Sequence, residues 1–387
     1  MRRFSPTALA VTFLLAACGG SPPPRAFSES GPLPTFQVPA DHVKVRLTGR
    51  FDLRNEAQPV FSYPGTALEV AFEADAVSVR LADRGSDDPK KSNRYQVVVN
   101  GKPTQEVVVS PKQELYEVAS KLGPGQHRVA LYRLTESNVG KTAFLGFVLH
   151  GKDARVLDLP ARPKRRIEVI GDSISCGYGN KLSIEPPPKG NPTTGFTPQN
   201  ENHYLTYGAL TARTFDAELH TECVSGIGVT RDYGGNTQNQ MPDIFARTMP
   251  SDAEPGWDFA RYVPDAVIIN LGTNDFGKGV PDDVTFIAAY EGFVAQLREL
   301  YPRAHLVCAT GPTTSDSWPA GEARLTKYNA WVSGVVERRN QGGDDAISFL
   351  AFTPQKPPFG EDWHPTLATH KKMSAELNAH LRKELGW

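Results

Sequence analysis

The sequence predicts an all-β domain of jelly-roll type followed by an α/β domain, a five-stranded parallel sheet with helices on both faces. Short alternating apolar runs separated by turns fill residues 41–160. From Arg165 to the end at residue 387, apolar strands alternate with amphipathic helices. A chain of 387 residues is long enough for both domains.

The first forty residues have the composition of a leader and a linker. Met1-Arg2-Arg3 is basic, and residues 8–17 are an apolar run too short to span a bilayer. We therefore expect residues 1–17 to be a signal peptide. Residues 18–40 contain Pro22-Pro23-Pro24 and are expected to form an extended, Pro-rich linker.

The end of the apolar run, Leu15-Ala16-Ala17-Cys18-Gly19, resembles the bacterial lipobox. The resemblance implies cleavage before Cys18 and lipidation of its thiol; an ordinary signal peptide with an incidental cysteine is the alternative. Since Gly19 rather than Asp follows the cysteine, the resemblance further implies a lipoprotein of the bacterial cell envelope, held at the outer membrane or cell surface.

Composition and charge exclude several classes of protein. Hydrophobic residues make up 39% and charged residues 22% of the chain, as in ordinary globular proteins. The net charge of −1 gives no basic field for nucleic acid. Besides Cys18 there are three cysteines, so they cannot all pair with one another. Cys308 is expected to be a buried thiol, and a Cys176–Cys223 pair remains open. No cysteine and histidine spacing resembles a zinc site.

Within residues 41–160, apolar runs at 68–72, 76–81, 95–99, 106–109, 126–132 and 144–149 predict strands. Asn100-Gly101 between two of these runs predicts a hairpin. No helix of ten residues is expected here. Such a domain is suited to sugar binding or to bracing its neighbour, and composition does not separate these roles.

In the second half, residues 167–170, 218–224, 265–271, 304–309 and 346–352 are predicted strands, and residues 205–215, 282–300 and 367–385 are predicted helices. A further helix is indicated by Leu325, Tyr328, Val332 and Val335.

Polar loops follow several of these strands. They are Gly171-Asp172-Ser173, Ser225-Gly226, Gly272-Thr273-Asn274-Asp275 and, before the last helix, Asp362-Trp363-His364-Pro365. Ligands bind at the carboxyl edge of open α/β sheets. A serine hydroxyl becomes a nucleophile when a histidine accepts its proton and donors hold the oxyanion. The joint occurrence of these loops predicts such a site.

Each loop also has a plainer interpretation. Gly-Asp-Ser is a common turn sequence, Asp172 fixes such a turn, and Asn274 could cap one. His364 before Pro365 could help to start the last helix. We expect His203 and His370 to be surface or cap residues.

Together, the four loops resemble the ordered blocks of the SGNH (GDSL-type) hydrolases over residues 165–387, whose fold is flavodoxin-like. With a β domain in front, the chain resembles carbohydrate esterase family 2, enzymes that remove acetyl groups from xylan and related sugars. Arg133-Leu134-Thr135-Glu136 is similar to a recurrent Arg-Thr-Glu segment of that family.

The resemblance implies roles for individual residues. Ser173 would attack the ester carbonyl, and His364 would be the general base. The Gly226 amide, the Asn274 side chain and the Ser173 amide would hold the oxyanion.

The group that orients His364 is less clear from the sequence. Most SGNH enzymes use a carboxylate three residues before the histidine, which is Glu361 here, whereas the esterase family uses an aspartate two residues before it. Asp362 is therefore our choice, and a backbone carbonyl is the alternative. Trp363 is as well suited to packing as to stacking on a sugar ring, and Tyr233 and Trp318 are weaker candidates for substrate contact.

We therefore expect a serine esterase that removes O-acetyl groups from polysaccharide through an acyl-enzyme. The resemblance implies no metal and no cofactor, and we expect a monomer. The alternatives are a lipase or thioesterase of the same superfamily, and a non-catalytic carbohydrate-binding lipoprotein. An α/β-hydrolase lipase is disfavoured because Ser175 replaces the second glycine of Gly-x-Ser-x-Gly.

Overall fold

The structure is a computed structural model that describes residues 33–185 and 195–387. The predicted signal peptide, Cys18 and most of the predicted linker lie outside the described residues. Within these two ranges, no helix combines the length and the apolar character needed to cross a membrane.

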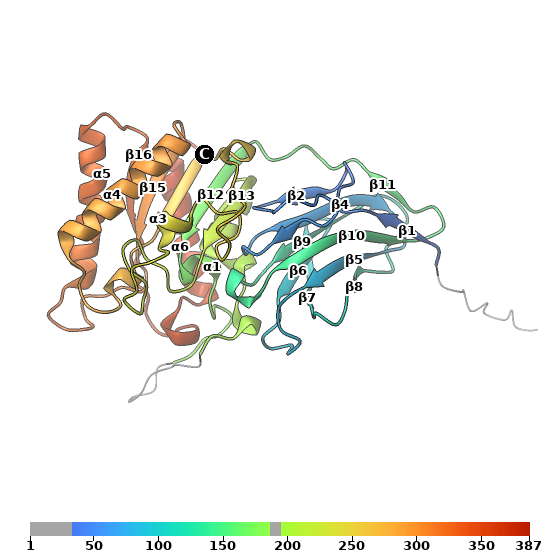
Figure 1. Ribbon diagram of the computed structural model, residues 1–387, viewed down its shortest axis with the longest axis horizontal. Coiled ribbons are helices and arrows are strands. Elements are labelled where there is room, and N and C mark those ends of the chain that lie inside the picture. Colours follow the sequence, from blue (N-terminus) through green and yellow to red (C-terminus); the bar gives the residue numbers. More distant parts are fainter. Residues whose placement is uncertain (1–32, 186–194) are drawn as a thin grey trace, which may run out of the picture. The chain divides into compact units, whose positions relative to one another are not determined.

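The first domain consists of two sheets that enclose one apolar core (Figure 1). One has the strand order β1-β10-β5-β8, with β3 beside β10, and the other has the order β11-β4-β9-β6-β7, with β2 beside β4. All pairings are antiparallel. The strands are β1 Thr35–Val38, β2 Arg46–Thr48, β3 Val60–Phe61, β4 Ala67–Glu73, β5 Ala76–Asp83, β6 Arg94–Val99, β7 Lys102–Val108, β8 Leu115–Ala119, β9 His127–Arg133, β10 Thr142–His150 and β11 Arg155–Leu157.

The predicted hairpin is confirmed. Asn100 (φ 51°) and Gly101 (φ 79°) both adopt left-handed conformations between β6 and β7. A two-residue turn of this kind matches the twist of the flanking strands, and Asn-Gly adopts it at little cost. The one helical turn described within residues 41–160 is η1 Ser137–Val139.

The predicted linker extends too far toward the first domain. Residues 35–38, inside the predicted range 18–40, form β1, which pairs with β10 from Thr35↔His150 to Val38↔Phe147. Of the four side chains of β1, Val38 alone is buried. The strand is held by main-chain pairing, so its sequence lacks the alternating apolar pattern on which the prediction depended.

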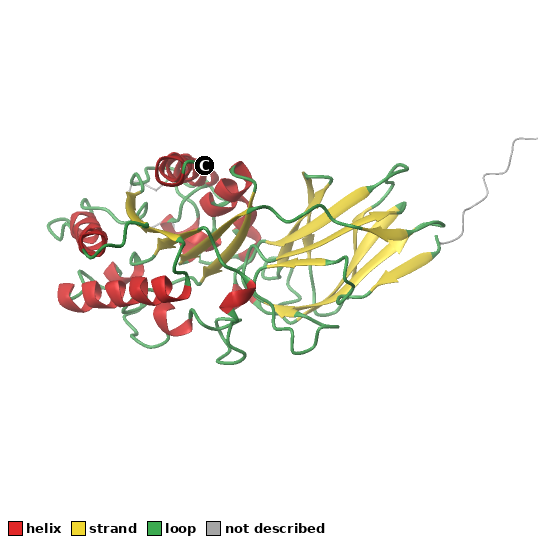
Figure 2. Ribbon diagram, turned by 90° about the horizontal axis from the view of Figure 1, so that it is seen from above, coloured by secondary structure: helices red, strands yellow, loops and turns green. Residues whose placement is uncertain are grey.

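The second domain contains the predicted five-stranded parallel sheet, in the order β13-β12-β14-β15-β16. Figure 2 shows the long helices beside this sheet, and strands joined by loops in the first domain. The strands are β12 Arg165–Gly171, β13 Ala217–Cys223, β14 Ala266–Asn270, β15 His305–Thr310 and β16 Ile347–Ala351. The α-helices are α1 Ser173–Cys176, α2 Tyr207–Thr214, α3 Met241–Ile244, α4 Asp283–Leu300, α5 Arg324–Gln341 and α6 Leu367–Leu385. The 3-10 turns are η2 Pro198–Asn200, η3 His203–Leu205, η4 Phe259–Arg261, η5 Asn274–Phe276 and η6 Glu361–Trp363.

The central strand β14 is apolar at every position up to Asn270 because both of its sides are buried. Val267 and Ile269 belong to a cluster with side chains of α4 and α5. Ala266 and Ile268 belong to another cluster with side chains of α2 and α6. Parallel strands buried on both sides lose the alternation of apolar and polar residues.

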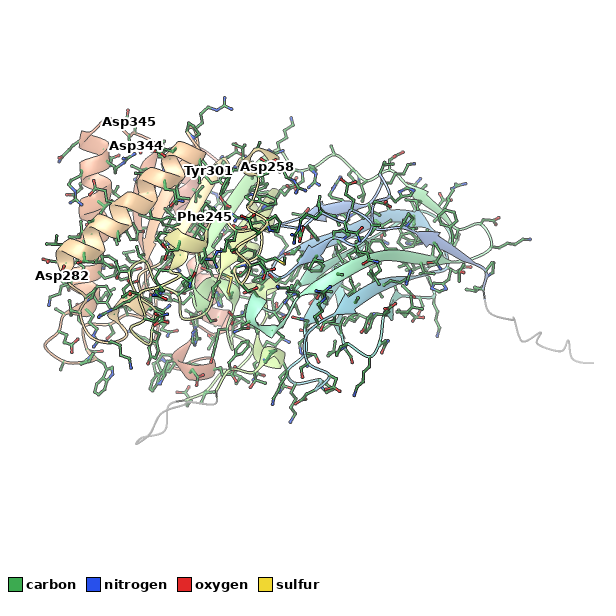
Figure 3. All side chains as sticks on the ribbon, in the orientation of Figure 1. Phe245, Asp258, Asp282, Tyr301, Asp344 and Asp345 are labelled. Atoms are coloured by element: carbon green, nitrogen blue, oxygen red, sulfur yellow. A yellow bond between two sulfur atoms is a disulfide. The ribbon has the colours of Figure 1, made fainter. Side chains whose placement is uncertain are left out.

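A buried arginine of the first domain reaches into the second. Arg50 is fully buried; its NH2 group lies 3.1 Å from Glu168 Oε1 and its Nε lies 3.0 Å from Glu222 Oε1. Its NH1 group donates to the carbonyl oxygens of Arg247, at 2.9 Å, and of Phe245. The Phe245 ring, labelled in Figure 3, also lies 4.7 Å from the guanidinium carbon. Because an uncompensated charge in such a place is costly, these contacts couple the two domains.

Candidate active site

The register of the sheet aligns the loops that were predicted to carry the site. Gly171 of β12 lies opposite Cys223 of β13 and Asn270 of β14. The next residues of each strand therefore emerge at one edge, as is usual for ligand sites of open parallel sheets. Ser173 begins the short helix α1 directly after β12 and is 7% exposed.

The predicted nucleophile and the predicted base lie in contact. His364 Nε2 is 2.7 Å from Ser173 Oγ, although the residues are 191 positions apart. His364 Nδ1 lies 2.9 Å from the main-chain oxygen of Glu361. A carbonyl oxygen only accepts, so Nδ1 carries the hydrogen and the lone pair of Nε2 faces the serine hydroxyl.

Burial keeps this imidazole uncharged. It lowers the pKa of His364 to about 4, against opposing effects of the Glu361 carbonyl and the Asp362 carboxylate. Near neutral pH His364 is therefore in the form that accepts a proton.

The orientation of His364 differs from our expectation. The main-chain oxygen of Glu361, rather than the Asp362 carboxylate, lies at Nδ1. Asp362 has a left-handed conformation (φ 48°, ψ 43°), and its carboxylate accepts hydrogen bonds from Tyr178 OH at 2.6 Å and from the Gly195 amide at 3.2 Å. The Tyr178 ring stacks on the His364 ring with a centroid distance of 4.0 Å. Asp362 thus acts on the imidazole through Tyr178 and through its charge.

The Glu361 carboxylate, the other sequence candidate, is also directed away from His364. It is fully buried and accepts from the Thr197 amide and the Asn200 side chain, both at 3.1 Å.

Two main-chain amides at this edge of the sheet are free to donate hydrogen bonds. Within residues 33–185 and 195–387, the amides of Ser173 and Gly226 have no hydrogen-bond acceptor. Gly226 has φ 82°, a conformation that glycine adopts without strain, and its carbonyl accepts from the Tyr233 amide at 2.8 Å. The turn therefore leaves an amide free beside the end of β13.

Asn274 is held firmly beside the same edge. Its Nδ2 donates to the Ile227 carbonyl at 2.8 Å and to Asp172 Oδ2 at 3.2 Å, while Asp172 Oδ1 caps α1 by accepting from the Ile174 amide. Asp172 thus fixes the serine turn, as expected. Both hydrogens of Nδ2 have acceptors, so a contribution of Asn274 to the oxyanion requires sharing of the longer bond. Burial raises the pKa of Asp172 to about 7.

The first domain also contributes to this edge. Glu136 is fully buried; its carboxylate accepts from Ser225 Oγ at 2.6 Å and from the Ser225 amide at 2.9 Å. The Glu136 amide donates to Glu201 Oε2 at 3.0 Å. Glu136, at the end of the Arg133–Glu136 segment, therefore holds Ser225, the residue before Gly226, by two hydrogen bonds.

Three aromatic residues were predicted to contact substrate. Trp363 is 39% exposed, with its ring 4.9 Å from that of Phe359. Tyr233, bonded to the Gly226 turn, is 62% exposed, and Trp318 is 80% exposed in the loop after β15. Their substrate contacts stay predictions.

Sequence reasoning missed several contacts around the site. Cys176 and Cys223, left open above, form a disulfide with a Cα–Cα distance of 5.6 Å. Cys308 is the buried thiol that we expected.

Two histidines differ from our expectation. His203 and His370, expected at the surface or in caps, are buried: His203 Nε2 lies 3.0 Å from Thr221 Oγ1, and His370 Nδ1 accepts from the Tyr207 amide. Histidines alone carry no sequence signal for such partners.

Two known families match successive parts of the chain. Residues 47–160 match the family described as carbohydrate esterase 2 N-terminal, and residues 169–372 match the GDSL-like lipase/acylhydrolase family. A solved family two carbohydrate esterase from Clostridium thermocellum, in complex with cellohexaose, is 35% identical with a TM-score of 0.80, and the match covers 89% of this chain and 99% of that one. The chain belongs to carbohydrate esterase family 2.

Other relatives of this family 2 chain differ in length. Cellulase/esterase CelE of Acetivibrio thermocellus is 35% identical over 349 residues, which are 90% of this chain but 40% of CelE. An acetylxylan esterase/glucomannan deacetylase of Cellvibrio japonicus is 28% identical over 91% of this chain and 92% of its own length.

Proposed function

We propose that this protein is a serine esterase that removes O-acetyl groups from polysaccharide, acetylxylan or related sugar esters, through an acyl-enzyme. The observation that carries the proposal is the 2.7 Å contact between His364 Nε2 and Ser173 Oγ, with the imidazole uncharged. The acetylxylan esterase/glucomannan deacetylase of Cellvibrio japonicus, a relative of this chain, supports the substrate class.

In the proposed reaction, Ser173 Oγ attacks the acetyl carbonyl carbon while its proton passes to His364 Nε2. The carbonyl oxygen becomes an oxyanion facing the amides of Ser173 and Gly226, each of which contributes about 3–4 kcal/mol to transition-state stabilisation. Asn274 Nδ2 adds a weaker contact by sharing the hydrogen that it donates to Asp172. Collapse expels the sugar oxygen, which takes the proton from His364. Water then attacks the acetyl carbonyl carbon while His364 takes its proton; the bond from that carbon to Ser173 Oγ breaks, Ser173 takes the proton back from His364, and acetate leaves.

The orientation of His364 is assigned to the Glu361 carbonyl, with Tyr178 stacked on the ring and held by Asp362. Sugar rings would stack on Trp363 and Tyr233, whose exposed rings belong to the loops that carry His364 and Gly226. Trp318 is a third proposed contact.

We also propose the finer architecture expected from the sequence. Core clusters that share alternate residues of β14 with α4 and α5 or with α2 and α6 support helices on both faces of the sheet. Two antiparallel sheets around one core support the jelly-roll assignment of the first domain.

For localisation, we propose a monomeric lipoprotein anchored to the outer membrane or cell surface through Cys18. The basic start, the apolar run and Leu15–Gly19 support this proposal. Cys18→Ala is expected to release the protein from the membrane fraction, and a wild-type protein that is soluble and unacylated would contradict the anchor.

The activity is tested with acetylated xylan and an aryl acetate. Ser173→Ala is expected to lower kcat by roughly 10⁴-fold or more. Ser175→Ala is the matched control, because Ser175 Oγ lies 2.8 Å from Tyr207 OH and has that partner instead of the base. Activity that survives Ser173→Ala would remove Ser173 from the mechanism, and absence of activity in the folded wild type would favour a binding protein.

A further inference from the structure

A polar cavity of about 150 Å³ lies toward the amino ends of β12 and β13, whereas Ser173 follows the carboxyl end of β12. Both domains line it: Gly49 belongs to the first domain, and Arg166, Glu218 and His220 belong to β12 and β13. Trp257 completes this wall, next to Asp258, which is labelled in Figure 3.

Two buried N–H donors of the cavity wall lack acceptors. His220 Nε2 accepts from the Gly49 amide at 3.1 Å, so the hydrogen of the neutral ring is on Nδ1. His220 Nδ1 and Trp257 Nε1 have no hydrogen-bond partner within the described ranges, although the side chains are 4% and 7% exposed. Buried donors without partners are costly, so an acceptor that reached these two N–H groups would stabilise the protein.

The charges around the cavity favour an anion. Arg162, Arg166 and Arg261 line it, and Glu218 is the one acidic side chain among the lining residues. Glu218 is paired with Arg162 at 2.6 Å. The guanidinium groups of Arg166 and Arg261 have no hydrogen bond or ion pair in the part of the chain that the structure describes.

The two unpaired arginines are nonetheless held in place. The Arg166 guanidinium carbon lies 5.8 Å from the Tyr262 ring centroid, and that of Arg261 lies 5.2 Å from the Trp257 ring. Stacking on aromatic rings limits the freedom of a guanidinium and leaves its N–H donors available. Burial and the nearby arginines lower the pKa of His220, so its ring adds a neutral donor to the positive field.

We propose that this cavity binds a small oxyanion, a phosphate, sulfate or carboxylate group, through the N–H donors of His220 and Trp257 and the guanidinium groups of Arg166 and Arg261. Charge-assisted hydrogen bonds from arginine are the usual means of binding such groups. Because residues of both domains form the wall, the bound anion stabilises their junction. The proposal is independent of the esterase reaction at Ser173.

The test uses the full chain at constant ionic strength, with chloride as the reference anion. Inorganic phosphate, inorganic sulfate and glucuronate are titrated separately by calorimetry, and thermal unfolding is followed at each concentration. Saturable binding of one anion per chain is expected, with a Tm that rises with anion concentration. Tightest binding of phosphate or sulfate identifies a tetrahedral ligand, and tightest binding of glucuronate identifies the carboxylate of an acidic sugar.

Three variants decide the location. Trp257→Phe keeps the ring beside Arg261 but removes the N–H donor, and roughly 10-fold weaker binding is expected. The double substitution Arg166→Gln and Arg261→Gln is expected to abolish binding. Arg303→Gln removes an exposed arginine elsewhere and is expected to bind as wild type does.

The proposal is overturned if no titration saturates, or if the double variant binds as tightly as Arg303→Gln. Retained acetyl esterase activity in Trp257→Phe and the double variant separates loss of the anion site from loss of the fold.

Discussion

Substitution of Glu136, a residue of the first domain, is expected to slow a reaction carried out by the second. Its carboxylate holds both the amide and the hydroxyl of Ser225, the residue before the proposed oxyanion donor Gly226. Glu136→Ala removes both bonds. Hydrogen bonds to charged groups contribute about 1.5–3 kcal/mol each. The turn at Ser225 and Gly226 therefore loses the two bonds that hold it against the first domain.

The expected effect on rate depends on the position of the Gly226 amide. A displacement of about 1 Å at a reacting group costs roughly 100-fold, and complete loss of one oxyanion donor costs about 10²–10³-fold. We therefore expect Glu136→Ala to lower kcat on acetylated xylan by about 100-fold with little change in KM, since the contact is made to the transition state.

Glu136→Gln distinguishes positioning from packing. The amide oxygen can still accept from the Ser225 N–H and the amide nitrogen can donate to Ser225 Oγ, so partial rescue, with a loss of about 10-fold, is expected. Glu114→Ala, an exposed site in the same domain, is the control. Steady-state kinetics well below the Tm of each variant is the assay. Glu136→Ala with wild-type kcat, or with KM raised and kcat unchanged, would refute this reasoning.

Three further outcomes are expected. Arg50→Met leaves Glu168 and Glu222 buried without their cation and should lower the free energy of unfolding by about 3–5 kcal/mol; Arg54→Met, with a 67% exposed side chain, should change it little, and equal effects in denaturant titrations would contradict the role of Arg50. As the pH is lowered, kcat/KM should fall with a midpoint near pH 4, the lowered pKa of His364, because protonation removes the base. Asp362→Asn should move this midpoint to lower pH, since the Asp362 carboxylate raises the pKa of His364. A wild-type midpoint near the ordinary 6.5 would show that the imidazole is solvated. Replacing Cys176 and Cys223, which are 47 residues apart, by serine should cost about 4 kcal/mol from loop-closure entropy, and unchanged thermal unfolding under reducing and non-reducing conditions would show that the bond is not formed.

The sequence was most informative where one strand or turn determines its own structure. The Asn100-Gly101 hairpin and the apolar strand at residues 266–270 are determined by local chemistry. The proximity of the loops that form the site could also be predicted from the sequence, because parallel strands in register place the loops that follow them at one edge of the sheet.

The sequence was least informative where a contact depends on the backbone conformation of a loop or on a residue far away in the sequence. The left-handed conformations of Asp362 (φ 48°) and Trp363 (φ 69°) decide that a carbonyl rather than a carboxylate faces His364 Nδ1. Two successive non-glycine residues such as Asp362 and Trp363 have no sequence preference from which a left-handed conformation could be predicted. Arg50 and Glu136 likewise acquire their partners when the two domains dock, and neither contact has a local pattern.

The buried contacts of Arg50 limit how the second domain can be transferred into another protein. A fragment starting at Arg165 would keep Glu168 and Glu222 but lose the cation that compensates them, and Ser225 would lose Glu136. Grafts and chimeras should therefore keep the first domain together with the second. A first domain exchanged from another protein needs an arginine at the place of Arg50 and a glutamate at the place of Glu136, whatever the rest of its sequence.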